Sequence, residues 1–339
     1  MKSGKEAAII AILLAGAVFA CTAGIASAHF TMIIPSDSDD TIWAVTPEDY
    51  IAELGQTKTV YILWGHPYEH ISFDMASVPE VSVRKPDGTV EQLTTEKISV
   101  DSMDEDGNPG TFTAYKASFT VDQRGDSIIC VRYEDKDQKL VDYVKAIIHC
   151  GEEQWIGWDA ELGEKAEIVP FTRPYGLEQG FVFTGKALYD ASALKDADVE
   201  VEKYHPQAEG VTVVGEAEDM FPYDPPMMFT RVTKTDAGGE FAYTLDEPGI
   251  WFVGAYGPEV EGLTQRSVFI VPVLAAFPAE EEAVAPAGLE ELKARVKVLE
   301  EESRSKQAHN AEGSPGFGMI PAIIGLLIVL YLVIKRRRQ

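Results

Sequence analysis

The chain contains 339 residues, and its 55 acidic against 29 basic side chains give a formal net charge of −26. Charge of this sign repels nucleic acid and attracts cations, so we exclude nucleic acid as a partner. The sequence contains no P-loop, no nucleophile elbow and no HExxH motif. We therefore predict no enzymatic activity.

Residues 1–28 have the layout of a secretory signal peptide. Two lysines precede an apolar run from Ala7 to Ala20, and the small residues Ala26-Ser27-Ala28 form a cleavage site. Cleavage there makes His29 the first residue of the mature chain. Two alternatives stay open: an uncleaved signal-anchor helix, and a lipoprotein signal that uses Cys21.

Short alternating segments separated by turn sequences predict an all-β fold. Turn sequences such as Pro86-Asp87-Gly88 are typical of antiparallel sheets rather than of β-α-β units. We predict two antiparallel β-sandwich domains of Ig-like or Greek-key type, over residues 29–168 and 175–273. The segment from Val60 to Trp64 is apolar throughout, which predicts a strand that is covered on both faces.

Two cysteines, Cys130 and Cys150, remain once the signal peptide is removed. Each lies in a segment with the pattern of a strand, and a polar loop from Glu134 to Leu140 joins the two segments. Neighbouring strands would bring the sulfurs close together. The pair is therefore a candidate disulfide, as suits an oxidising compartment.

Three histidines of the first predicted domain are candidate metal ligands. His29 would be the new N-terminus, where the imidazole Nδ1 and the free α-amine can chelate one ion. His66 and His70 follow the predicted buried strand, in a turn that Gly65 and Pro67 keep from being helical. Their spacing across the turn can direct both imidazoles at one ion. Neutral imidazole suits Ni²⁺, Co²⁺, Cu²⁺ and Zn²⁺.

Other polar residues could add to this set. Glu69 is a candidate acidic ligand, and His149 is a candidate fourth imidazole, with packing beside Cys150 as the alternative. The acidic loop from Asp104 to Asn108 resembles a calcium loop in composition, but Pro109 stands where an EF-hand needs glycine. We predict a solvated turn there.

The composition changes after the second predicted domain. Over residues 277–313 we predict an acidic linker and a short amphipathic helix. An uncharged apolar stretch from Met319 to Ile334 precedes a basic tail, which belongs on the cytoplasmic side. Residues 314–339, which begin Ser-Pro-Gly-Phe-Gly, resemble the archaeal PGF-type C-terminal sorting signal. That resemblance implies that a lipid replaces the tail, and a plain transmembrane anchor is the alternative.

Several motifs of the ectodomain together resemble a known family of exported proteins. In chain order the motifs are Ala28 to Ser36, Gly65 to His70, Phe183 to Asp190, Asp198 to Val201, Thr235 to Phe241 and Pro248 to Trp251. The resemblance is to the periplasmic component of nickel/cobalt transport, the NikM/NikK-like group. It implies a β-rich protein that captures a divalent transition metal for a membrane metal-transport complex. The C-terminal anchor departs from this family, and it would keep such a protein at the cell surface.

Three functional hypotheses follow. The leading one is a surface-anchored, metal-binding accessory protein of a membrane importer, with His29, His66 and His70 as ligands of Ni²⁺ or Co²⁺. The first alternative is a structural or adhesive cell-envelope protein with no specific small ligand. The second alternative is a copper protein with a histidine brace, which uses the same residues.

Overall fold

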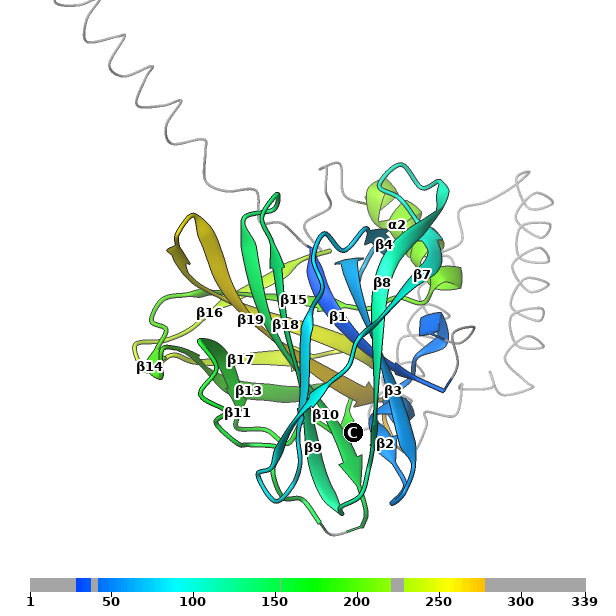
Figure 1. The fold of residues 1–339 in the computed structure, drawn as a ribbon. Coiled ribbons are helices and arrows are strands. Elements are labelled where there is room, and N and C mark those ends of the chain that lie inside the picture. Colours follow the sequence, from blue (N-terminus) through cyan, green and yellow to red (C-terminus); the bar gives the residue numbers. More distant parts are fainter. Residues whose placement is uncertain (1–28, 38–41, 153, 221–228, 278–339) are drawn as a thin grey trace, which may run out of the picture. The chain divides into compact units, whose positions relative to one another are not determined.

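The computed structural model describes residues 29–37, 42–152, 154–220 and 229–277. Strands in three sheets make up most of this part of the chain, with one α-helix (Figure 1). The prediction of an all-β fold is confirmed at this level. The predicted signal peptide, the C-terminal anchor and the linker from residue 278 on lie outside the described residues. Among the described helices, none is long and apolar enough to cross a membrane.

The central sheet has ten strands (Figure 1). Eight of them follow one another in the spatial order β16 (Arg231–Lys234), β15 (Asp198–Lys203), β18 (Gly249–Val260), β19 (Leu263–Leu274), β10 (Leu140–Cys150), β9 (Gly125–Asp135), β5 (Glu80–Arg84) and β6 (Val90–Leu93). Two short strands lie off this path: β2 (Ile51–Ala52) pairs with β10, and β12 (Leu177–Glu178) pairs with β19.

Two smaller sheets flank the central one. The five-stranded sheet contains β1 (Phe30–Ser36), β3 (Thr57–His66), β4 (Ile71–Phe73), β7 (Glu96–Met103) and β8 (Pro109–Thr120). The four-stranded sheet contains β11 (Ala166–Pro170), β13 (Phe181–Tyr189), β14 (Ser192–Ala193) and β17 (Glu240–Leu245). The helices within the described ranges are η1 (Ile42–Ala44), η2 (Pro47–Tyr50) and α2 (Gln207–Met220).

The core consists of two large apolar clusters, one on each face of the central sheet. Along β9, Ile129 and Val131 lie in the cluster shared with the five-stranded sheet, whereas Ile128 lies in the cluster shared with the four-stranded sheet. All eleven residues of β10 are buried. A strand covered on both faces is apolar almost throughout because both sets of alternating side chains are buried. The predicted strand from Val60 to Trp64 is likewise buried at every position.

The central sheet takes strands from both of the stretches that the sequence predicts as separate domains. β10 and β19 pair in parallel, from Leu140 opposite Thr264 to Lys145 opposite Phe269. The described residues up to Phe277 belong to one compact unit. Parallel neighbours require a long crossover connection, and local turn sequences carry no information about it.

The predicted disulfide between Cys130 and Cys150 is wrong, since both thiols are free and buried. The two cysteines do lie on neighbouring antiparallel strands, but Cys130 is opposite Lys145 and Cys150 is opposite Gly125. The cysteines are therefore five residue steps apart along the strands, or about 17 Å. An odd number of steps also directs them to opposite faces, and each belongs to a different apolar cluster.

Candidate metal centre

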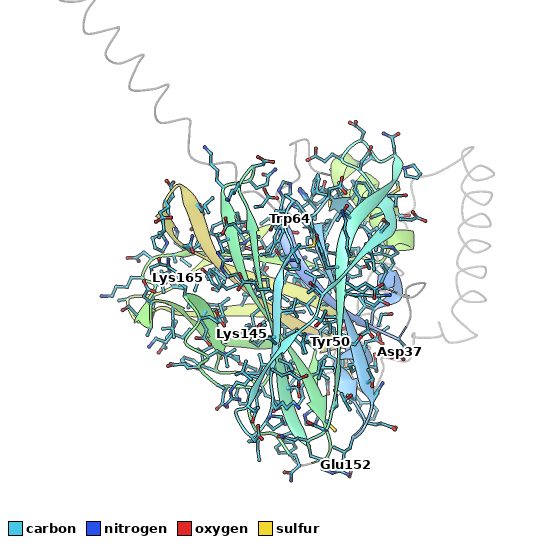
Figure 2. The ribbon with its side chains drawn as sticks, in the orientation of Figure 1. Asp37, Tyr50, Trp64, Lys145, Glu152 and Lys165 are labelled. Carbon is cyan, nitrogen blue, oxygen red and sulfur yellow. The ribbon has the colours of Figure 1, made fainter. Side chains whose placement is uncertain are left out.

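The pairing of β1 with β3 brings two of the predicted ligands together. Phe30 lies opposite Gly65, so His29, just before β1, is placed across from His66, the last residue of β3. The centroids of the two imidazole rings are 4.5 Å apart. Trp64, two residues before His66 on β3, is labelled in the upper part of Figure 2, and Glu152 is labelled at the bottom.

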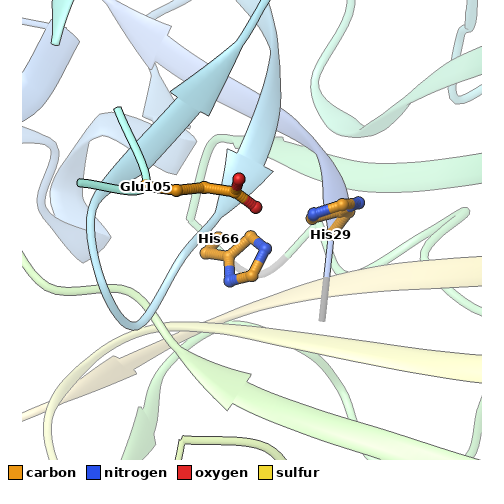
Figure 3. A group of neighbouring side chains, drawn as sticks. All are labelled: His29, His66 and Glu105. Carbon is orange, nitrogen blue, oxygen red and sulfur yellow. The ribbon is translucent and has the colours of Figure 1, made fainter. Parts of the chain in front are cut away.

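A carboxylate from a third element faces the two imidazoles (Figure 3). Glu105 lies in the turn between β7 and β8, and one ligand atom each from His29, His66 and Glu105 lie within 4.8 Å of one another. Asp104 fixes this turn, because its Oδ1 accepts hydrogen bonds from the backbone nitrogens of Asp106 and Asn108 at 3.0 and 2.7 Å. Two imidazoles and a carboxylate are a suitable donor set for a divalent transition metal.

Hydrogen bonding orients the His66 ring. Nδ1 of His66 lies 2.5 Å from Oε2 of Glu69. A carboxylate can only accept, so Nδ1 carries the hydrogen, and in the neutral imidazole Nε2 then has the lone pair. That Nε2 is buried and has no hydrogen-bond partner among the described residues. Ligand histidines in metal sites are oriented in the same way, by a carboxylate on the other ring nitrogen.

The surroundings of His29 keep its imidazole neutral. Burial, His66 and Arg266 together lower its pKa to about 3. The rings of Trp64 and Phe73 lie 5.5 and 4.6 Å from the His29 ring and cover it with apolar surface. Metal binding requires an unprotonated imidazole. His29 meets this condition throughout the physiological pH range.

A buried ion pair fixes the backbone at His29. The guanidinium of Arg266 donates to the carbonyl of His29 and forms two bonds to the Asp142 carboxylate, at 2.8 and 2.9 Å. Oδ2 of Asp142 also accepts hydrogen bonds from the backbone nitrogen and the hydroxyl of Thr31, at 3.1 and 2.8 Å. Side chains thereby satisfy the carbonyl of His29 and the backbone nitrogen of Thr31 at the edge of β1 that has no neighbouring strand. Sequence reasoning missed this pair, although a charge within an otherwise apolar strand is a usable signal.

His70, the third predicted imidazole, is not part of this group. Its Nδ1 donates to the carbonyl of His205 at 3.0 Å, and its ring lies 4.6 Å from the ring of Trp43. Burial lowers its pKa to about 4. The residue adopts a positive φ of 57°. The His70 side chain therefore links the turn after β3 to the segment that follows β15 through a hydrogen bond.

His149 makes a separate set of contacts on β10. Its Nδ1 lies 2.7 Å from Oδ1 of Asp126, and its ring stacks on Tyr175 with centroids 4.3 Å apart. The hydroxyl of Tyr175 donates to the other oxygen of Asp126 at 3.0 Å. These contacts account for His149 as a packed side chain at the end of the sheet.

Two family models match the chain. One, described as "Domain of unknown function (DUF4198)", matches residues 26–259, and the PGF-CTERM motif matches residues 314–337. The second match places the protein at the archaeal cell surface, anchored to the membrane through its C-terminus. No curated protein matches the chain.

Several solved structures match at low identity. Trypsin-activated alpha-2-macroglobulin from Escherichia coli is 12% identical, with 73% of this chain and 16% of that chain covered and a TM-score of 0.20. A bacterial ice-binding adhesin is 11% identical, with 73% and 64% covered and a TM-score of 0.20. A DUF4785 family protein from Legionella pneumophila is 12% identical, with 71% and 56% covered and a TM-score of 0.23. The chain spans less than two thirds of each, and TM-scores this low carry no argument about fold or function.

Proposed function

We propose that this chain, which belongs to the DUF4198 family of domains of unknown function, captures a divalent transition-metal ion at the cell surface for a membrane importer. The ion is Ni²⁺ or Co²⁺, and it is the cargo of the protein. His29 and His66 supply the imidazole ligands, and Glu105 supplies a carboxylate. The importer complex is the partner that receives the ion.

One observation supports this proposal above the others: His66, which groups with His29 and Glu105 at ligand distance, has a buried Nε2 without a hydrogen-bond partner among the described residues. A buried polar atom without a hydrogen bond is costly, by about 1–3 kcal/mol. A metal ion would satisfy this lone pair, and Glu69 already holds the ring in the tautomer that a metal requires. The net charge of −26 also attracts cations towards the protein.

The location favours the same role. The C-terminal anchor, whether a lipid or a transmembrane helix, would keep the protein beside the importers of the same membrane. Glu105 is exposed, unlike the two half-buried histidines. An exposed ligand on a hairpin turn gives an incoming ion a first point of contact, and it can also release the ion to a transporter.

Calorimetric titration of the processed protein, purified from membranes, tests this proposal. Ni²⁺, Co²⁺, Cu²⁺ and Zn²⁺ are titrated separately, with a second protein that retains Ala28 before His29 as the control. Saturable binding of one Ni²⁺ or Co²⁺ ion per chain is the expected result. Equally weak binding of every metal would instead favour a structural or adhesive envelope protein.

Copper binding through a histidine brace is a second candidate function. It is favoured by the pairing of a predicted N-terminal histidine with one further imidazole, since a brace consists of the terminal amine and two imidazoles. Nitrogen donors bind Cu²⁺ more tightly than Ni²⁺ or Co²⁺. The retained Ala28 separates the two functions: a brace loses its affinity when the amine is blocked, whereas a site built on the two imidazoles and Glu105 does not.

A further inference from the structure

Two buried carboxyl groups lie on the strand β15 behind the metal centre. Glu200 and Glu202 are 2% and 1% exposed. Their neighbours Val199 and Val201 belong to the cluster shared with the four-stranded sheet. Side chains alternate along a strand, so both carboxyls point to the opposite face, towards the sheet that carries His29 and His66.

The carboxyl groups of Glu200 and Glu202 differ in their hydrogen bonds. Oε2 of Glu200 accepts a hydrogen bond of 2.6 Å from the hydroxyl of Tyr256. Glu202 accepts a hydrogen bond from the hydroxyl of Thr230 through Oε1. The second oxygen of Glu202, Oε2, is buried and has no hydrogen-bond partner among the described residues. A well-buried acid with an unused oxygen is rare unless another group pairs with it.

Acidic groups outnumber cations in this region. Burial raises the pKa of Glu202 well above its usual value, and repulsion from Glu200 and Glu69 raises it further. The guanidinium of Arg266 lies 4.0 Å from Oε2 of Glu200, but it already forms two bonds to Asp142. Because Arg266 is paired with Asp142, no cation among the described residues bonds to Oε2 of Glu202.

The backbone of β1 directs a nitrogen towards these acids. In an extended strand the nitrogen and the carbonyl of one residue point to the same edge. The carbonyl of His29 faces Arg266, so its α-nitrogen faces the same side. The next residue, Phe30, packs against Phe252 with ring centroids 6.0 Å apart, and Phe252 is the partner of Glu202 in the pairing of β18 with β15.

We propose that Glu202 is the counter-ion of the α-ammonium group that signal-peptide removal creates at His29. Before processing, this nitrogen is the uncharged amide of the bond between Ala28 and His29. Hydrolysis of that bond by a signal peptidase consumes one water, leaves the carboxylate on Ala28 and gives His29 an amine that takes up a proton. Signal-peptide removal thus completes a buried ion pair beside the backbone of His29.

This inference rests on the cleavage that is part of the proposed function, but it does not require any metal. The test is a thermodynamic cycle of four full-length proteins in detergent with a chelator present. They are the processed protein and its Glu202→Gln variant, each with and without a retained Ala28. Urea unfolding gives the folding equilibrium constant of each.

We expect the retained Ala28 to lower that constant at least about tenfold when Glu202 is present, because it removes a hydrogen bond between charged groups. In Glu202→Gln the retained Ala28 should change the constant less than about twofold. Glu200→Gln is the matched control, and it should keep the sensitivity to Ala28. Equal effects of Ala28 with and without Glu202 would overturn the proposal.

A second measurement covers the case in which a variant fails to fold. An acylating reagent at neutral pH should modify the α-amine of the folded, metal-free protein at least about tenfold more slowly than that of the urea-unfolded protein. Equal rates would show an amine that is open to solvent, and the proposed pair with Glu202 would then be wrong. Neither result depends on whether Ni²⁺ or Co²⁺ binds.

Discussion

Alanine substitutions of His66 and His70 form a matched pair that separates metal binding from packing. The two side chains lie at opposite ends of one turn. In each ring Nδ1 forms one hydrogen bond, and Nε2 is buried without a partner among the described residues. Only His66 lies within ligand distance of His29 and Glu105. We therefore expect His66→Ala to abolish tight metal binding and His70→Ala to preserve it.

The expected magnitudes follow from the contacts of each ring. Losing a group that merely orients a ligand histidine costs about 10- to 100-fold in metal affinity, so losing the ligand itself should cost at least about 100-fold. His70→Ala deletes the hydrogen bond to His205 and leaves a cavity beside Trp43. The free energy of unfolding should fall by about 2–4 kcal/mol, with affinity changed less than about threefold.

Two assays distinguish these outcomes. Calorimetric titration with Ni²⁺ at pH 7 gives the affinity of each variant, and urea unfolding in the presence of a chelator gives its stability. Equal losses of affinity in both variants would refute the assignment of His66 as the ligand. A larger loss of metal affinity in His70→Ala than in His66→Ala would refute it as well, because that result would place the ion beside His70.

Three further predictions concern stability and the thiols. Between pH 6.5 and pH 4, His70 should account for ~3 kcal/mol of the stability that the metal-free protein loses as the pH falls, because the unfolded chain protonates His70 near its ordinary pKa whereas burial holds the folded pKa at about 4. His29, whose pKa burial lowers to about 3, should add a further loss over the same range. Unfolding curves of His70→Ala should show a smaller loss than those of the unsubstituted protein, and an equal loss would contradict the role of His70. Gly65→Ala should lower the free energy of unfolding by more than about 2 kcal/mol, since a Cβ there would lie 1.9 Å from the carbonyl oxygen of Ile71. Gly215→Ala in α2, where an added Cβ would meet no atom within 4 Å beyond the helix's own backbone and the neighbouring residues, should be neutral or stabilising by up to about 1 kcal/mol. Equal losses in both glycine variants would refute the steric argument. Mass spectrometry after alkylation in denaturant without a reductant should find Cys130 and Cys150 both modified, and an unmodified pair lighter by two hydrogens would contradict the register of β9 and β10.

The fold was predictable where side-chain alternation and burial determine it. The uniformly apolar segment from Val60 to Trp64 is a strand with every residue buried, as its composition indicates. The parallel pairing of β10 with β19 was not predictable, because it depends on strands far apart in sequence. The separation of Cys130 and Cys150 was missed for a similar reason: adjacency of two strands was foreseeable, but their register was not.

The candidate site was predictable only in part. His29 and His66 stand out as histidines at the predicted N-terminus and at a strand end, and the register of β1 with β3 brings them together. The acidic loop that contains Glu105 is noticeable by composition but is interpreted as a solvated turn, since only the folded hairpin brings Glu105 to the two histidines. His70 has the same local spacing as a ligand, yet its positive φ turns it towards His205.

Anomalous X-ray diffraction from crystals of the processed protein grown with Ni²⁺, with data collected at the nickel edge, would locate the bound ion. We expect one peak per chain within bonding distance of ring nitrogens of His29 and His66 and of the Glu105 carboxylate. A peak at His70 or His149, or no peak beside His66, would contradict the proposed metal centre.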